Sequence, residues 1–191
     1  MVRMTETHIV VLAASVRGER TGRLLADWAA GRVGEQTQFD APDLIDLAEC
    51  ELPDDELLQP GGGRRTPISD RIEAADGFVI VTPEYNHSYP ASLKRAIDWH
   101  YREWMFKPAT VLSYGVHGGL LATEHLRGVF AELHVVTTRR VVGLSAPWRD
   151  LGPAGYAAPE QTVKAFDMAL GELGWWAETL RMARRERPYE P

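Results

Sequence analysis

Short apolar runs alternate along the chain with longer stretches that have helical spacing. Residues 8–14 (HIVVLAA), 77–82 (GFVIVT) and 107–115 (KPATVLSYG) are typical of strands buried on both faces of a parallel sheet. Two weaker strands are predicted at residues 39–47 and 135–142. The second of these carries the polar sequence TTRR, which favours a position at an edge of the sheet.

Segments with helical spacing separate the strands. Apolar residues recur at intervals of three and four, which predicts helices at residues 24–29, 68–75, 93–101, 120–133 and 163–180. Prolines and glycines are frequent in residues 51–66 and 147–159, and we expect both segments to be surface loops, the first of them mobile.

Five strands that alternate with five helices predict an α/β fold in which helices cover both faces of a parallel sheet. Right-handed crossovers and the length of 191 residues favour a flavodoxin-like three-layer sandwich with strand order 2-1-3-4-5, in a single domain over residues 1–191. In that order the first and third strands part at a switch point. Ligands of such sheets bind beyond the carboxyl ends of the strands there, so we expect the functional residues in the loops that follow them.

Composition excludes several classes of partner and site. The single Cys50 cannot form an internal disulfide, and no cysteine and histidine pairs have zinc-ligand spacing, so we expect no metal and a reducing compartment. A net charge of -6 disfavours a nucleic-acid partner. Residues 1–7 lack the apolar core of a signal peptide, and no apolar run approaches the ~18 residues of a membrane span. These features predict a cytoplasmic protein that binds no membrane.

The first candidate loop, residues 14–22, leads from a strand into a helix. Hydroxyls of Ser15 and Thr21, the guanidinium of Arg17 and the backbone N–H groups of a helix N-terminus can together bind a phosphate. The loop matches neither the Walker pattern nor G-x-G-x-x-G. A capped turn with exposed arginines is the alternative.

The second candidate loop follows the strand at 77–82 and reads TPEYNHSYP. Pro83 and Pro90 fix the backbone so that it can present N–H and C=O groups to the polar edge of a flat ring, and Tyr85 offers a face for stacking. Asn86 tolerates the positive φ of a sharp turn. The alternative is that the tyrosines of this loop only pack.

The third candidate loop, SYGVHGG, follows the strand at 107–115. Its three glycines allow a planar ligand to lie directly on the backbone. His117 could contact a ligand or donate a proton, although we interpret this single loop histidine as incidental.

A phosphate site beside a site for a flat ring describes flavin mononucleotide (FMN). The sequences ASVRxxRTG, TPEYNHSYPASLKRAIDW, EWMFKPA and SYGVHGG resemble the NADPH-dependent FMN reductase family, over residues 9 to 136. The family usually has glycine where this chain has Ala14, and alanine fits there only with a negative φ.

The resemblance implies three groups of cofactor-binding residues. It implies that the first loop binds the FMN phosphate and that the second and third bind the isoalloxazine ring. The implied residues are Ser15, Arg17, Thr21 and Gly22, then Pro83, Glu84, Tyr85, Asn86 and Ser88, and finally Ser113, Tyr114, Gly115, Gly118 and Gly119.

The same resemblance implies hydride transfer from NADPH or NADH to the flavin and delivery of two electrons to a small-molecule acceptor such as a quinone or free flavin. The cofactor performs this chemistry, so we expect no catalytic side chain. Three alternatives have other functions: an electron carrier or FMN-binding regulator without nicotinamide turnover, a response regulator, and a phosphatase. The last two require an aspartate after the third strand or glycines and an arginine near Cys50, and the chain has neither.

A cluster of aromatic residues near position 100 suggests self-association. Aromatic and methionine side chains are enriched at the centres of protein interfaces, which favours a homodimer or homotetramer. The cluster comprises Trp99, His100, Tyr101, Trp104, Met105 and Phe106. The alternative is that these side chains belong to the core of the domain.

Overall fold

A parallel sheet forms the centre of the computed structural model, which describes residues 7–189. The main path of the sheet has the order β2-β1-β3-β4-β5, and a sixth strand, β6, also pairs with β4. All of these pairings are parallel. The strands are β1 (Ile9–Ala13), β2 (Asp43–Asp46), β3 (Gly77–Pro83), β4 (Pro108–Gly115), β5 (Val136–Thr137) and β6 (Val142–Ser145). The predicted order 2-1-3-4-5 is therefore confirmed.

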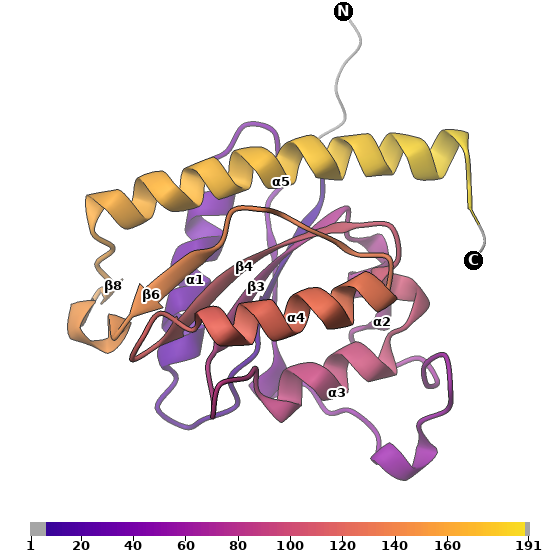
Figure 1. Ribbon diagram of the computed structural model, residues 1–191, viewed down its shortest axis with the longest axis horizontal. Helices are drawn as coiled ribbons and strands as arrows, with labels where there is room; N and C mark the ends of the chain where they lie inside the picture. The colour runs from indigo at the N-terminus through magenta and orange to yellow at the C-terminus, as the bar shows by residue number, and fades with distance from the viewer. Residues whose placement is uncertain (1–6, 190–191) are drawn as a thin grey trace, which may run out of the picture.

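Helices cover both faces of the sheet, as predicted. They are α1 (Thr21–Gly34), α2 (Ser69–Ala74), α3 (Ala91–Trp99), α4 (Leu120–Glu132) and α5 (Glu160–Glu186). Figure 1 shows α5 along one side of the molecule, with α3 and α4 on the other side of the sheet. Because alternate residues of a strand point to opposite faces, Val11 and Val79 pack with α1 and α5, whereas Val10 and Phe78 pack with α2, α3 and α4.

The edge strand differs from its prediction. We expected one strand at residues 135–142, but the chain leaves the sheet between β5 and β6. The hydroxyl of Thr138 donates to the carbonyl of Arg140, and the carboxylate of Glu172 on α5 accepts hydrogen bonds from the backbone N–H groups of Arg139 and Arg140. These bonds satisfy backbone groups that ladder bonds would otherwise satisfy. The strand then resumes beside the carboxyl end of β4.

Two other predicted boundaries also change. The strand expected at 39–47 contracts to β2 and is followed by a short 3-10 helix, η1 (Leu47–Glu49). The loop predicted at 147–159 contains a 3-10 helix, η4 (Pro147–Asp150), and a hairpin formed by β7 (Leu151–Gly152) and β8 (Gly155–Tyr156).

The glycine-rich segment at 51–66 is a surface loop with one 3-10 turn, η2 (Asp55–Leu57). The Arg95 guanidinium on α3 donates to the backbone carbonyls of Leu52 and Pro53 and pairs with the Asp55 carboxylate. The loop is thus tied to α3 at its start. Its mobility stays a prediction.

Four of the six residues in the aromatic cluster near position 100 are buried within their own chain, which favours the alternative that they belong to the core. Self-association itself stays a prediction. Trp99 and His100 are 1% and 0% exposed, and Trp104 is 0% exposed and lies against Phe78 with ring centroids 4.5 Å apart. A short 3-10 helix, η3 (Arg102–Trp104), turns Trp104 inward. Trp104 therefore packs into the core that covers this face of the sheet.

Among the described residues, no helix is both long enough and apolar enough to cross a membrane. The segment from which we predicted the absence of a signal peptide lies mostly outside the described residues, which begin at Thr7.

Candidate functional site

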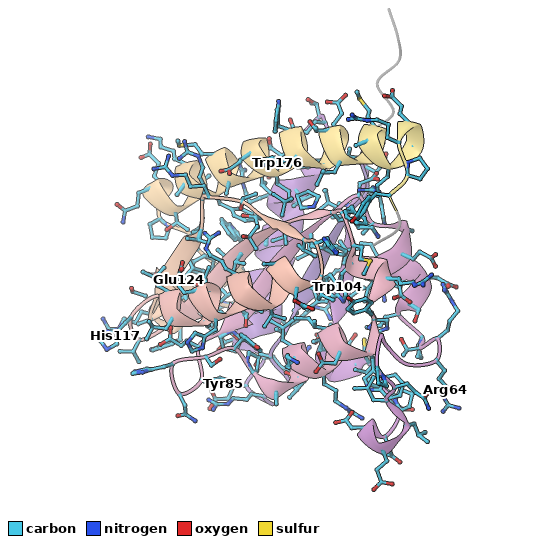
Figure 2. All side chains as sticks on the ribbon, turned by 45° about the vertical axis from the view of Figure 1, so that its right-hand side comes forward. Arg64, Tyr85, Trp104, His117, Glu124 and Trp176 are labelled. Atoms are coloured by element: carbon cyan, nitrogen blue, oxygen red, sulfur yellow. The ribbon has the colours of Figure 1, made fainter. Side chains whose placement is uncertain are left out.

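A cavity of about 310 Å³ lies at the carboxyl edge of β1, β3 and β4, where the switch point of the sheet was expected. Figure 2 shows Tyr85 and His117 at this end of the molecule, and Arg64 of the glycine-rich loop at the opposite end. The cavity is lined by Ser15, Arg17, Glu19, Arg20, Thr21, Pro83, Glu84, Tyr85, Asn86, Tyr114, Gly115, Val116 and Trp148. Nine of these thirteen lining residues were predicted, and all three candidate loops contribute to them.

The first loop presents an open helix N-terminus to the cavity. Arg20 occupies the N-cap position of α1 in a left-handed conformation, with φ 58°, and makes no side-chain cap hydrogen bond. The first N–H groups of a helix require acceptors, and without a cap they can bind an anion. Ser15 and Thr21 place hydroxyls at the same wall. Ala14 is not among the positive-φ residues, so the predicted condition for alanine at this position is met.

Gly22 allows this wall to pack closely. A Cβ atom at this position would lie 2.6 Å from the hydroxyl oxygen of Tyr114 and 2.8 Å from the Cβ of Ser15, closer than real side chains approach. Gly22 itself is buried and does not line the cavity. Its role in the structure is to bring the hydroxyl of Tyr114 up to the start of α1.

Tyr85 contacts the first loop instead of leaving its ring open. Its hydroxyl oxygen lies 3.1 Å from the Oγ of Ser15, and the guanidinium carbon of Arg17 lies 4.0 Å from the centroid of its ring. The second distance is within the range of a cation–π interaction. The two loops that we expected to bind phosphate and ring separately are therefore joined by this side chain.

Residues 85–88 form a tight turn. The N–H of Tyr85 donates to the carbonyl of Ser88 at 2.7 Å, and the N–H of Ser88 donates to the carbonyl of Tyr85 at 3.0 Å. Asn86 and His87 both have positive φ, 50° and 66°, which is the pattern of a type I′ turn. Positive φ was predicted for Asn86 but not for His87. The Ser88 hydroxyl lies 3.0 Å from Nδ1 of His125 on α4, and Ser88 does not line the cavity.

Glu84 connects the second loop to α4. Its carboxylate oxygen Oε2 accepts hydrogen bonds from the N–H groups of Leu121 at 3.0 Å and Ala122 at 3.4 Å. A carboxylate is favourable at a helix N-terminus because it satisfies unpaired N–H groups and complements the helix dipole. Glu84 thus lines the cavity while its carboxylate caps α4.

The third loop turns tightly from β4 into α4. The Ser113 side chain is fully buried and donates to the carbonyl of Gly118 at 2.8 Å. Gly118 and Gly119 have φ of 83° and 73°, and a Cβ on Gly119 would lie 2.8 Å from the N atom of Tyr114. These three predicted residues build the turn and do not line the cavity, whereas Tyr114 and Gly115 do. His117 does not line it either, and its interpretation as incidental stays a prediction.

Burial controls the ionisation of Tyr114. Removal from water raises the pKa of its hydroxyl to about 12, although the hydrogen bond with Ser15 opposes this shift. The Tyr114 hydroxyl therefore stays protonated near neutral pH and can donate a hydrogen bond at the wall formed by the first loop.

Four lining residues were missed from the sequence: Glu19, Arg20, Val116 and Trp148. Arg20 forms an ion pair with Asp46, whose side chain is 1% exposed, and Arg23 pairs with the same carboxylate at 3.2 Å. The position of Arg20 in the first candidate loop was a signal that could have identified it. Trp148 lies in η4, in a region with no periodic pattern, and only the fold brings it to the cavity.

Proteins similar to this chain are named as reductases of FMN or of a quinone. The model of the NADPH-dependent FMN reductase family matches residues 7–148. An NAD(P)H-dependent FMN reductase of Schizosaccharomyces pombe is 35% identical over 173 residues, which cover 86% of this chain and 84% of that protein. A 2-hydroxy-1,4-benzoquinone reductase of a Burkholderia species is 33% identical over 135 residues, 67% of this chain and 72% of that protein.

The fold also occurs among solved structures. The flavoenzyme NAD(P)H:(acceptor) oxidoreductase FerB of Paracoccus denitrificans matches with a TM-score of 0.72 at 24% identity, over 91% of this chain and 98% of that one. This similarity supports the flavodoxin-like architecture.

Proposed function

The chain belongs to the NADPH-dependent FMN reductase family, and on that basis we propose that it is an NAD(P)H-dependent flavoenzyme that reduces a small acceptor such as a quinone or free flavin. The observation that carries this proposal is the cavity at the switch point, in which an uncapped helix N-terminus lies beside residues of the loops that follow β3 and β4.

The residues of the cavity fit FMN. The uncapped start of α1 and the side chains of Ser15, Arg17 and Thr21 provide donors of the kind that bind a phosphate. The cavity volume of about 310 Å³ lies within the range of small-molecule sites. We assign the phosphate to this wall and the ring to the wall formed by Pro83, Asn86 and Gly115.

Bound FMN supplies the redox chemistry, because it can take a hydride from NADPH or NADH and pass two electrons to an acceptor. The protein's contribution is to bind and orient. Arg17 neutralises phosphate charge, and the tight turn at residues 85–88 holds the second loop against the cavity. No side chain of this chain is assigned the role of a general acid or base.

An absorption spectrum of the purified protein, followed by anaerobic addition of NADPH, tests this function. We expect bound flavin with a 1:1 stoichiometry, bleaching on addition of NADPH, and recovery of colour when a quinone is added. A protein that binds FMN but is not reduced by NADPH or NADH is an electron carrier or regulator. A protein that binds no FMN contradicts the proposal altogether.

We further propose that residues 1–191 act as one domain in the cytoplasm. The family match ends at residue 148, but α5 contributes Phe166, Leu170 and Leu173 to the core that also contains Val79 of β3. Removal of α5 therefore exposes the part of this face of the sheet that α1 does not cover. The composition, with one cysteine, is the support for a reducing compartment.

Self-association is proposed through a different surface from the aromatic cluster. Met168, Trp175 and Met182 lie seven residues apart on α5 and are 53%, 62% and 50% exposed. This spacing aligns them along one face of the helix. The same face carries Gly171, where an added Cβ would meet nothing within 4 Å, so a large side chain of another molecule has room there.

A second copy of the chain matches this face. If two α5 helices pack antiparallel about Trp175, Met168 of one copy faces Met182 of the other, and Lys164 faces Glu186. A two-fold interface needs such self-complementarity. We expect sedimentation to detect a homodimer, or a tetramer built from it, and Trp175→Glu to yield monomers, whereas Leu57→Glu at another exposed apolar site leaves the assembly unchanged. A monomeric wild type contradicts the proposal.

A further inference from the structure

Trp148 is the one tryptophan that lines the candidate cavity, and it is not among the residues implied by the family resemblance. Its side chain is 46% exposed, in contrast to the fully buried Trp104. Large aromatic side chains at the wall of a cavity are typical contacts for flat ligands.

The two tyrosines of the cavity have their contacts satisfied within the protein. The Tyr85 ring is covered by the Arg17 guanidinium at 4.0 Å, and the Tyr85 hydroxyl lies against Ser15. Tyr114 is 6% exposed and presents its hydroxyl end to the start of α1. Of the aromatic side chains that line the cavity, Trp148 therefore has the most accessible ring.

The backbone fixes Trp148 relative to the third loop. Ala146 adopts a left-handed conformation, φ 48° and ψ 49°, and its N–H donates to the carbonyl of Gly115 at 2.8 Å. The N–H of Arg149 donates to the carbonyl of Ala146 at 3.1 Å, and the N–H of Ala157 donates to the carbonyl of Asp150 at 2.9 Å. Both sides of the turn that carries Trp148 are thus hydrogen-bonded.

The interruption of the edge strand is what brings this turn to the cavity. Because the chain leaves the sheet at residues 138–141 and rejoins as β6, Ser145 pairs with Gly115 at the carboxyl end of β4. The next residues then continue beyond the sheet edge, on the side where the cavity lies. Val116, which is 65% exposed, adds a second apolar side chain to this part of the wall.

We propose that Trp148 is a flavin-binding residue, whose indole packs against the flat ring system of bound FMN. This role replaces the stacking that we expected of Tyr85. The inference rests on the proposed function, because it assumes that FMN occupies the cavity.

Binding of FMN to the apoprotein, followed by flavin fluorescence, tests this assignment. An indole in contact with a flavin quenches flavin emission, and aromatic contacts of this kind change affinity by about three- to tenfold. We expect Trp148→Ala to raise the dissociation constant of FMN by that factor and to increase the emission of the bound flavin. Trp148→Phe should keep the affinity within about threefold, since the apolar face remains, and yet show stronger emission than the wild type.

Tyr189→Ala is the matched control, because Tyr189 is 65% exposed and does not line this cavity. Its affinity and emission should equal those of the wild type. If Trp148→Ala does not fold, the emission of Trp148→Phe decides the question, and unchanged emission overturns the proposal.

Other outcomes of the FMN-binding experiment lead to different conclusions. Unchanged FMN affinity and emission in Trp148→Ala overturn the proposal. If KM for a quinone or for NADPH rises at the same time, Trp148 belongs to the site of the second substrate, and the proposal is overturned as well. A wild-type protein that binds FMN and is reduced by NADPH keeps the proposed function intact under either result. A wild type that binds no FMN removes the proposed function itself.

Discussion

The hydroxyl oxygen of Tyr85 lies 3.1 Å from the hydroxyl oxygen of Ser15, which joins two loops separated by 70 residues in sequence. Arg17 adds to this contact through the face of the Tyr85 ring. The wall proposed for the phosphate thus includes a side chain from the loop proposed for the ring. A change in either loop should therefore affect phosphate binding.

Replacement of Arg17 tests the phosphate site directly. Arg17→Ala removes the charge-assisted contact proposed for the phosphate and should weaken FMN affinity by about 1.5 to 3 kcal/mol, roughly tenfold to a hundredfold. The fold should survive, because Arg17 is exposed. Excess FMN should restore most of the turnover, since hydride transfer takes place at the ring. Titration of the apoprotein with FMN measures the effect.

The control for this variant is Arg149→Ala. Arg149 is an exposed arginine next to Trp148 in η4, but it does not line the cavity. Its loss should leave FMN affinity unchanged. Equal affinity in the wild type and Arg17→Ala contradicts the placement of the phosphate while leaving the reductase function intact.

A double-mutant cycle tests the link between Arg17 and Tyr85. Tyr85→Phe keeps the ring beneath the guanidinium and should change FMN affinity by no more than about threefold, whereas Tyr85→Ala removes the ring and should weaken binding more. If Tyr85 acts by positioning Arg17, the effects of Tyr85→Ala and Arg17→Ala are not additive. Additive effects show that the two residues act independently.

The general fold could be predicted because its pattern is local. Runs such as residues 8–14 and 77–82 are apolar on both faces, and a strand of this kind has few stable environments other than the centre of a parallel sheet. The edge strand was harder to predict from the sequence. Thr138 and Glu172 decide where the chain leaves the sheet, and they are far apart in sequence, so no short window contains this information.

The site was predictable at the level of loops but less so at the level of side chains. The resemblance placed Ser113, Gly118 and Gly119 at the cofactor, whereas in the structure they build the turn between β4 and α4. Trp148, in contrast, was not predicted and yet lines the cavity. It lies in a loop without periodic pattern, and only the pairing of β6 with β4 brings it to the cavity.

The cap formed by Glu84 should contribute to stability. Glu84→Ala leaves the N–H groups of Leu121 and Ala122 without their carboxylate acceptor, and we expect a loss of about 0.5–2 kcal/mol in the free energy of unfolding. Denaturant unfolding monitored by circular dichroism measures this loss. Glu124→Ala, an exposed carboxylate on the same helix, is the control and should cost less. Equal losses in the two variants contradict the cap.

Two glycines in one region of the chain should respond oppositely to alanine. Gly119→Ala forces a residue with φ of 73° into contact with the N atom of Tyr114 at 2.8 Å and should destabilise the fold by about 3 kcal/mol or more. Gly128 lies within α4, and an added Cβ meets nothing within 4 Å. Gly128→Ala should stabilise the protein by up to about 1 kcal/mol. Thermal unfolding of both variants gives the comparison, and a tolerated Gly119→Ala contradicts the described turn.

Acid should destabilise the protein through His100. Burial lowers the pKa of His100 below its usual value of 6.5, and the side chain is 0% exposed. Its Nδ1 lies 2.7 Å from the carbonyl of Ala96, which can only accept, so Nδ1 carries the proton of the neutral ring. Nε2 is then free to accept a hydrogen bond from the Thr66 hydroxyl at 2.6 Å.

The sign of the effect follows from this lowered pKa. As the pH falls below 6.5, the unfolded chain takes up a proton at His100 before the folded protein does, so the free energy of unfolding decreases. The decrease from this one group is at most about 1.4 kcal/mol per pH unit. Urea unfolding at pH 8, 6.5 and 5 measures this free energy. In His100→Gln it should decrease less steeply as the pH falls, because glutamine cannot take up this proton. The variant should nevertheless be less stable than the wild type at pH 8. Parallel curves for the two proteins contradict a neutral, buried His100.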